Sequence, residues 1–184
     1  MGLRRWFSSL LRRRSGKAGG NVVPLPAVQG AGVSAGTQSG PRLVAYPLAV
    51  GERGPMAAAL ARAQLPVDDV DDPGRLFWRF DTVDDMPVGF GGIEICADAA
   101  LLHSIVTLPP VRTRGIGSAI VQVLEAEAAL QGCRHCYLLT MPGDGFFERL
   151  GYARCDPAAV PKGIRDTRLF AARAASAVVM AKRL

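Results

Sequence analysis

The sequence predicts a single domain of the α/β class, in which helices flank one β-sheet. The sheet is expected to be mixed, with parallel and antiparallel strands, which is an α+β feature. Three β-prone runs follow one another closely, at residues 76–82, 88–96 and 101–108. A long amphipathic stretch comes next, and further short β-prone runs follow it. Closely spaced strands favour an antiparallel meander, whereas a strand that follows a crossover helix can join the same sheet in parallel. Together these patterns indicate a mixed sheet.

Turn-forming residues separate and end the three runs. The first two runs, LFWRFDT and VGFGGIEIC, are joined by the sequence DDMP at 84–87, which is typical of a turn. The third run, LLHSIVTL, leads into Pro109 and Pro110. Proline has no backbone N–H to donate to a strand ladder, so we expect this strand to end there.

The stretch 115–131 has the spacing of an amphipathic helix. Its apolar side holds Ile116, Ala119, Ile120, Val123, Leu124 and Ala128, while Gln122, Glu125 and Glu127 lie elsewhere. After Gly132, CYLLT (136–140) predicts another strand. FFERLGY (146–152) predicts a short helix, a glycine C-cap and a strand start, and AASAVVMAK (174–182) predicts a closing strand.

The chain divides into a basic extension, residues 1–40, and a folded domain, residues 41–184. Residues 1–17 contain six basic and no acidic residues, and the rest contains 16 of each, so the net charge of +6 belongs to the extension. Residues 15–41 are rich in Gly, Ser, Ala and Pro, which predicts a flexible linker. The alternative is that this basic tail binds a membrane surface or nucleic acid. We favour the flexible linker and expect no nucleic-acid partner.

Composition indicates a cytoplasmic protein without a metal site. The four cysteines lie in or beside apolar strands with no secretory signal before them, which favours reduced thiols. Cys133 and Cys136 form a C-x-x-C pair, but a structural zinc site needs four ligands and the chain has two histidines. A redox pair is the remaining alternative. No apolar run approaches the roughly 20 residues needed to cross a bilayer.

The sequence RTRGIG at 112–117 predicts an anion-binding turn. It lies between a strand and a helix start, where the first helical N–H groups have no partner within the helix and the helix dipole favours negative charge. Glycine allows a diphosphate to approach the backbone closely. The string G-x-x-x-x-G-K-[ST] of P-loops is absent, and Ile120 occupies the third glycine position of a dinucleotide fingerprint.

The pattern R-x-x-G-x-G resembles the acetyl-CoA diphosphate loop of the GNAT superfamily of N-acetyltransferases. The strand order from about residue 42 to 184 is similar to that family as well, and FFERLGY resembles its FY-x-x-x-GF signature. The resemblance implies a central splayed sheet and acetyl-CoA as co-substrate. It also implies a set of cofactor-binding residues: Ile105, Val106, Thr107, Arg112, Thr113, Arg114, Gly115, Ile116, Gly117, Ser118, Phe146 and Phe147.

The same resemblance points to two replaced catalytic residues. Many members carry a glutamate early on the third strand, where this chain has Leu101, and a tyrosine where it has Phe147. His103, two residues further along the same strand face, is our first candidate for the base, because an ordinary imidazole titrates near neutral pH. Glu94 is the second candidate, and a water chain or an already deprotonated amine is the third. Tyr137 or Tyr152 could replace the acid.

The acceptor is expected to be a small-molecule primary amine. The segments from residue 100 onward, including VPKGIRDT, look like acetyltransferases of arsenic-resistance operons, which suggests a toxic amino-acid analogue or arsenical. Pro161 could open a helix that aligns Lys162, Arg165 and Arg168 to bind an oxyanion. An acidic loop at 68–72, between early helices, could instead attract a cationic amine, or could simply be a solvated turn.

Other functions stay open at this point. The replaced glutamate and tyrosine suggest an acetyl-CoA-binding sensor with little or no catalytic activity. A protein N-acetyltransferase and an interaction protein that docks through its basic tail are further alternatives. A homodimer is an additional prediction.

Overall fold

The computed structural model describes residues 41–109, 115–141 and 145–184. The predicted extension 1–40 lies outside these residues. The strands are β1 (Leu43–Pro47), β2 (Arg75–Thr82), β3 (Pro87–Cys96), β4 (Ala99–Thr107), β5 (His135–Thr140), β6 (Ala153–Arg154) and β7 (Val178–Arg183). The α-helices are α2 (Gly54–Arg62), α3 (Ile116–Leu130), α4 (Phe146–Arg149), α5 (Lys162–Arg165) and α6 (Arg168–Arg173), with short 3-10 turns at Val50–Glu52 and Pro157–Ala159.

The strands form one mixed sheet in the order β1-β2-β3-β4-β5-β7-β6. β4 and β5 are parallel, and every other neighbouring pair in this sheet is antiparallel. The helix α3 connects the two parallel strands, as a parallel pair requires a crossover. The predicted mixed α/β sheet is therefore confirmed.

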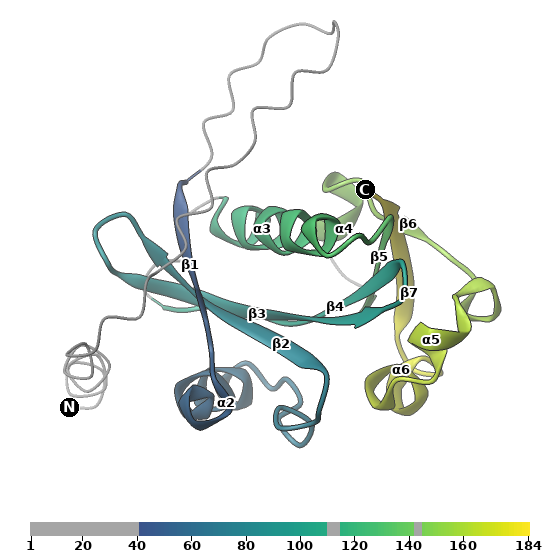
Figure 1. Ribbon diagram of the computed structural model, residues 1–184, viewed down its shortest axis with the longest axis horizontal. Coiled ribbons are helices and arrows are strands. Elements are labelled where there is room, and N and C mark those ends of the chain that lie inside the picture. The colour runs from purple at the N-terminus through teal and green to yellow at the C-terminus, as the bar shows by residue number, and fades with distance from the viewer. Residues whose placement is uncertain (1–40, 110–114, 142–144) are drawn as a thin grey trace, which may run out of the picture.

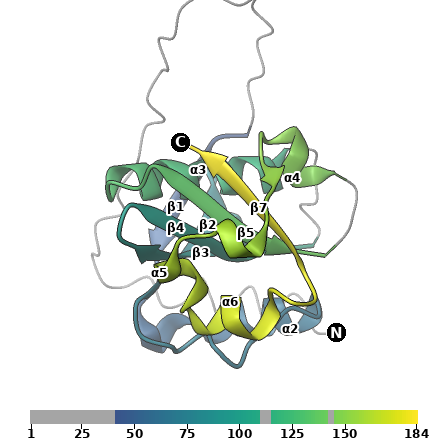
Figure 2. The same cartoon turned by 90° about the vertical axis from the view of Figure 1, so that its right-hand side faces the viewer.

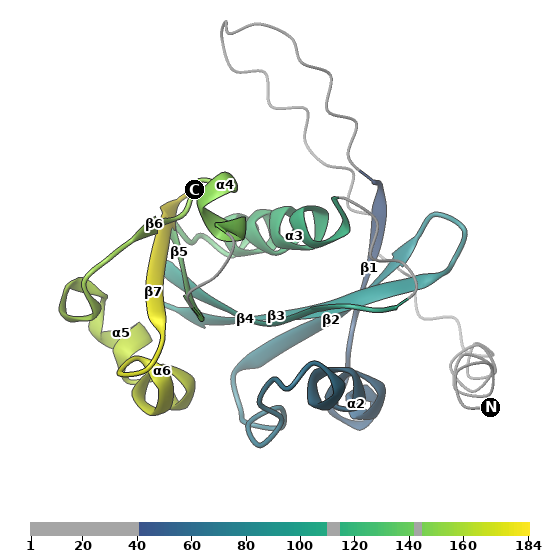
Figure 3. The ribbon, with the colours of Figure 1, turned by 180° about the vertical axis from the view of Figure 1, so that it is seen from behind.

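Helices cover both faces of the sheet. In Figure 1, α3 and α4 lie above the sheet, while α2, α5 and α6 lie below it. Figure 2 shows α5 and α6 beneath the half of the sheet that contains β5 and β7, and Figure 3 shows α2 beneath the other half. We call these the α3 face and the α2 face. The acidic loop 68–72 follows α2 and precedes β2, so the expectation that it joins two helices is wrong.

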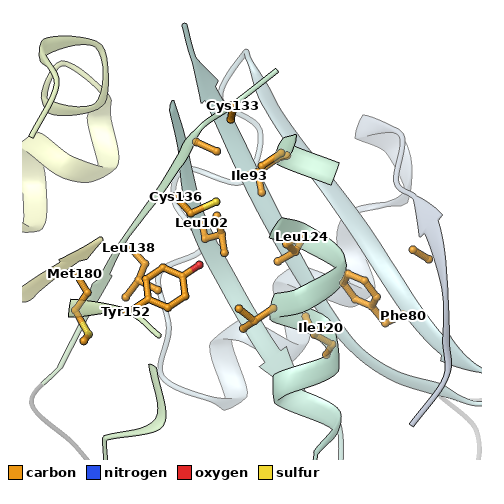
Figure 4. Close-up of a cluster of buried hydrophobic side chains, with 14 of the residues drawn as sticks. Phe80, Ile93, Leu102, Ile120, Leu124, Cys133, Cys136, Leu138, Tyr152 and Met180 are labelled. Carbon is orange, nitrogen blue, oxygen red and sulfur yellow. The ribbon is translucent and has the colours of Figure 1, made fainter. Parts of the chain in front are cut away.

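The largest core cluster fills the α3 face (Figure 4). It joins one side of α3 to the sheet through buried side chains that include Phe80, Ile93, Leu102, Ile120, Val121, Leu124, Ala128, Leu138 and Met180. The predicted apolar side of α3 is confirmed, but Glu125 is buried as well. Its carboxylate is compensated by Lys182, whose Nζ lies 2.7 Å from Oε2.

Two segments differ from the prediction. The closing strand begins at Val178 rather than at 174, because residues 174–177 form a turn after α6, which ends at Arg173. Thr167 caps that helix by accepting a hydrogen bond at Oγ1 from the N–H of Phe170. Strand β1 was not predicted, since a five-residue edge strand leaves little sequence pattern.

Replacing Leu124 with alanine should lower the free energy of unfolding by about 2–5 kcal/mol, because Leu124 is fully buried between α3 and the sheet. Urea denaturation measures the change. The matched control is Leu130→Ala in the last turn of the same helix, where the leucine is 72% exposed and little change is expected. Equal losses in the two variants would contradict the placement of α3.

Candidate functional site

An irregularity halfway along β4 changes the course of this strand. Phe90 of β3 pairs with Val106, whereas Gly92 pairs with His103, so two residues of β4 lie opposite the single residue Gly91. One of these two, Ser104, has a φ of +55°, in the left-handed region that only a few non-glycine residues adopt. These features define a β-bulge, which bends a strand and often re-aims it next to a functional site.

Beyond this bulge, β4 and β5 separate. Their parallel pairing runs from Ala99↔His135 to Leu102↔Leu138 and stops there. β5 continues to pair with β7 as far as Thr140. No strand of the described residues pairs with the rest of β4 on the β5 side, so this edge can pair with an extended ligand as an added strand would.

The start of α3 lies beside this open edge. Gly115, with a φ of +100°, precedes the helix. A methyl group built on Gly117 would lie 3.3 Å from Cζ of Phe146 and 3.9 Å from Cγ2 of Thr107. Three predicted cofactor-binding residues from β4, α3 and α4 therefore converge, and bulk at Gly117 would fill the space between them.

The helix geometry supports the predicted anion site. The N–H groups of Ile116, Gly117 and Ser118 lie in the first turn of α3, where a helix supplies no internal acceptor. Ile116 anchors this turn, because its side chain is buried in the α3-face core. The predicted residues Arg112, Thr113 and Arg114 lie outside the described residues.

The other predicted cofactor residues divide between the two faces. Ile105 packs against the α3-face core, whereas Val106 joins the cluster under α2. The Phe146 ring contacts the Phe147 ring edge to face, with centroids 4.9 Å apart. Phe147 in turn contacts Tyr152 at 5.8 Å. Phe147, at the position of the family tyrosine, is thus directed toward the buried ring of Tyr152.

Neither tyrosine proposed as a substitute acid is poised to lose a proton. Tyr152 is buried in the α3-face core, and burial raises its pKa above the ordinary value of 10. Tyr137 is buried in the cluster against α5 and α6, and burial raises its pKa too. Both groups stay protonated at neutral pH, and the raised pKa makes each of them a weaker proton donor than an ordinary tyrosine.

A buried ion pair organises the α2 face. Arg53, at the start of α2, donates hydrogen bonds to the carbonyl oxygens of Val70 and Arg75. The Arg75 guanidinium lies 2.8 Å from Asp69 Oδ2, and the two side chains are 2% and 7% exposed. Removing one partner of such a pair leaves an uncompensated buried charge, so the pair fixes the loop after α2 against the sheet.

Glu94 lies directly across from the position of the absent family glutamate. Its register partner on β4 is Leu101. The Oε2 atom of Glu94 lies 3.6 Å from Nε of Arg75 and has no hydrogen-bond partner among the described residues. Burial raises the pKa of Glu94 above its ordinary value of 4.5, while the charge of Arg75 acts in the opposite direction.

His103 is buried and neutral. Its ring meets the Phe77 ring edge to face at 5.1 Å and occupies the space above Gly92, where a Cβ would come within 2.7 Å of Cε1. Nδ1 lies 3.2 Å from Ser104 Oγ, and Nε2 has no hydrogen-bond partner among the described residues. Burial, followed by the charge of Arg75, lowers the pKa of His103 to about 3. Such an imidazole accepts a proton only weakly at neutral pH.

The predicted row of basic residues after Pro161 is divided by the structure. Lys162 and Arg165 belong to α5, but Arg168 begins a separate helix, so the expected single helix is wrong. The chain turns at the Thr167 cap between them. Lys162 pairs with Asp166 in its own helix, whereas Arg168 reaches the acidic loop, 3.0 Å from Asp72 and 3.6 Å from Asp68.

Arg53 and Arg75 were not singled out from the sequence, and Asp69 was noted only as a member of the acidic loop. The sequence did contain one indication for Arg75, which is a charged residue at the start of a β-prone run.

Within residues 41–109, 115–141 and 145–184, no group of three histidine, cysteine or acidic side chains could hold a metal ion. Over the same residues, no helix is both long and apolar enough to cross a membrane. The four cysteines are free thiols.

Comparison with solved structures shows the fold. An N-acetylglutamate synthase from Neisseria gonorrhoeae, complexed with coenzyme A and N-acetyl-glutamate, is 13% identical with a TM-score of 0.62, over 77% of this chain and 35% of that one. The chain thus spans about a third of that protein. Rv2747 from Mycobacterium tuberculosis, in complex with CoA and NLQ, is 17% identical with a TM-score of 0.62, over 77% of this chain and 99% of that one. An acetyltransferase of GNAT family from Staphylococcus aureus Mu50 is 13% identical with a TM-score of 0.58, over 77% and 99%.

Sequence comparison shows the family. No curated protein matches the chain. Residues 47–152, more than half of the 184, match the acetyltransferase (GNAT) family. That span contains the β4 bulge, the start of α3 and FFERLGY. The chain therefore belongs to the acetyltransferase (GNAT) family.

Proposed function

We propose that this protein transfers an acetyl group from acetyl-CoA to a primary amine of a small molecule. The observation that carries the proposal is the separation of β4 from β5 after Leu102, next to the N–H groups in the first turn of α3. An open strand edge and a helix N-terminus suit the two parts of the cofactor, an extended amide-bearing arm and a diphosphate.

In this proposal the arm of acetyl-CoA pairs with Ile105, Val106 and Thr107 of β4. The diphosphate binds the backbone from Arg112 to Ser118, and the glycine at 117 leaves room for it. Phe146 and Phe147 line the arm. The bound coenzyme A in the Neisseria and Mycobacterium structures supports the choice of ligand.

Acetyl transfer requires a base for the acceptor. The amine nitrogen forms a bond to the thioester carbon, the carbon–sulfur bond breaks, and the proton of the ammonium passes to a base. Glu94 suits this step better than His103, because its pKa is raised toward neutrality while that of His103 is lowered to about 3. Glu94 also lies across from Leu101, the position where the family glutamate is missing.

The leaving group needs little assistance. An ordinary thiol has a pKa near 8.5, so a thiolate can depart without a general acid. The low pKa of the leaving thiol supports catalytic activity although Phe147 replaces the family tyrosine.

A sensor that binds acetyl-CoA without turnover is the second candidate function, and it is favoured by the two replacements, Leu101 and Phe147.

Two kinds of acceptor are proposed, a small molecule and a protein amine. Resemblance to the arsenic-resistance subgroup suggests a toxic amino-acid analogue or an arsenical, held through Lys162, Arg165 and Arg168. A protein amine is an alternative acceptor. A cytoplasmic location and a homodimer are also proposals that rest on the sequence.

Gly117→Trp should abolish acetyl-CoA binding, with a loss of affinity of roughly a hundredfold or more, because the indole fills the space bounded by Thr107 and Phe146. Isothermal titration calorimetry measures the affinity. The control is Gly51→Trp, which adds the same side chain where nothing lies within 4 Å. Wild-type affinity in a correctly folded Gly117→Trp variant would refute the proposed cofactor site.

Glu94→Gln should lower kcat/KM for the amine by about 10²- to 10⁴-fold, the usual effect of losing a general base. Glu94 must be ionised to accept a proton, so the wild-type rate should rise with pH through a limb centred above 4.5. That limb should disappear in the variant, whereas Glu127→Gln, a surface change on α3 at the partner of Gln131, should keep it. A limb that survives in Glu94→Gln but vanishes in His103→Phe would assign the base to His103.

His103→Phe should make the free energy of unfolding less sensitive to acid. The unfolded chain binds a proton on His103 as the pH falls below 6.5, while the folded chain does not until about pH 3. The stability that the neutral histidine supplies is therefore complete above pH 6.5 and is lost progressively between pH 6.5 and 3. Urea denaturation at several pH values in this window should show a steeper fall for the wild type. Identical slopes would show that His103 is not held neutral.

A further inference from the structure

Charged side chains from five segments, namely the start of α2, the acidic loop, β2, β3 and α6, meet on the α2 face. We call them the charged cluster, and its members are Arg53, Arg75, Arg168, Asp68, Asp69, Asp71, Asp72 and Glu94. Ion pairs of 4.0 Å or less connect each cation to at least one carboxylate. Three cations face five carboxylates, so the cluster has a net charge of −2 when all are ionised. A cationic ligand would compensate this excess.

The charged cluster has an inner part, around Arg75 and Asp69, and an outer part, around Arg168 and Asp68. The ion pairs of the two parts differ in how easily their partners can be separated. Arg75 and Asp69 are almost completely buried, and separating them would leave a charge without compensation. Arg168 is 59% exposed, and its partner Asp68 is more exposed still. Exposed ion pairs contribute little to stability. A ligand cation can therefore take the place of Arg168 on Asp68 and Asp72 without disturbing the fold.

Two polar atoms beside the inner part lack a hydrogen-bond partner among the described residues. They are Oε2 of Glu94 on β3 and Nε2 of His103 on β4. His103 is only 7% exposed, and its ring contacts the Phe77 ring, over which the Arg53 guanidinium lies at 4.8 Å, so His103 lies next to the cluster. Oε2 is an acceptor, and Nε2 is one as well when Nδ1 donates its proton to Ser104. An ammonium group carries three donors and suits both atoms.

We propose that the acceptor is a dication with two ammonium groups. One ammonium, which becomes acetylated, binds at Glu94 and His103, and the other replaces Arg168 on Asp68 and Asp72. The inference rests on the proposed acetyl transfer and specifies its acceptor. The reacting ammonium gives one proton to Glu94, and its nitrogen forms a bond to the acetyl carbon. The carbon–sulfur bond then breaks, and the second proton that the nitrogen loses passes to the departing thiolate of coenzyme A. The product has one positive charge fewer, which weakens its attraction to the cluster and favours release.

The test compares two amines with the same carbon chain, 1,4-diaminobutane and n-butylamine, by the rate of thiol release from acetyl-CoA. The wild type should prefer the diamine by about tenfold or more in kcat/KM, as one charge-assisted contact predicts. Asp72→Asn should bring the two amines close to equality. Arg168→Ala should lower KM for the diamine several-fold, because it frees Asp68 and Asp72 for the second ammonium. Asp84→Asn, the same substitution at the exposed β2–β3 turn, should retain the wild-type preference.

Several outcomes would overturn the inference. One is equal use of the two amines by the wild type, and another is a preference that persists in Asp72→Asn. Turnover confined to amino acids that carry a carboxylate, and lost in Arg168→Ala, would exclude a dication while leaving acetyl transfer intact.

A further measurement separates the inference from the proposed function. If no amine is acetylated, the proposed function fails, and calorimetric titration of 1,4-diaminobutane into the wild type then decides the inference alone. Binding that is lost in Asp72→Asn would support the dication site, and no binding would refute it.

Discussion

Two residues of β4, Ser104 and Ile105, lie opposite the single residue Gly91 of β3, and this extra residue redirects β4 halfway along its length. The first half of β4 stays in register with β5, whereas the second half pairs with β3 alone among the strands of the described residues. Without the bulge, the alternation of side chains along β4 would continue unchanged. The open edge and the position of Thr107 beside Gly117 both follow from it.

The two faces of the sheet differ in the side chains that they carry and therefore in their roles. The α3 face is apolar and holds α3 firmly, so that the first turn of this helix is fixed against the open edge. The α2 face carries the charges, in which the buried Arg75–Asp69 pair holds the acidic loop in place and the exposed Arg168 reaches it from α6. Because the open edge lies between the faces, a donor can bind along β4 while an acceptor approaches from the charged side.

Local sequence patterns predicted the central sheet, α3 and the glycine turn, because apolar periodicity and glycine spacing depend on neighbouring residues only. They failed where distant segments decide the outcome. The partners of Arg168 are 96 and 100 positions away, at Asp72 and Asp68, and no local pattern pairs them. Likewise, the ordinary pKa of histidine favoured His103 as the base, whereas burial against Phe77 and the charge of Arg75 lower its pKa. Glu94 gained support from the burial that raises its pKa and from the register that places it across from Leu101.

The central claim is that acetyl-CoA binds along the open half of β4 and against the first turn of α3. Amide hydrogen exchange with and without acetyl-CoA measures this directly, residue by residue. Exchange should slow at Ile105–Thr107 and at residues 116–118, and it should stay unchanged along β1, the edge strand on the far side of the sheet. Binding of acetyl-CoA that leaves exchange in β4 and at the start of α3 unaltered would contradict the account.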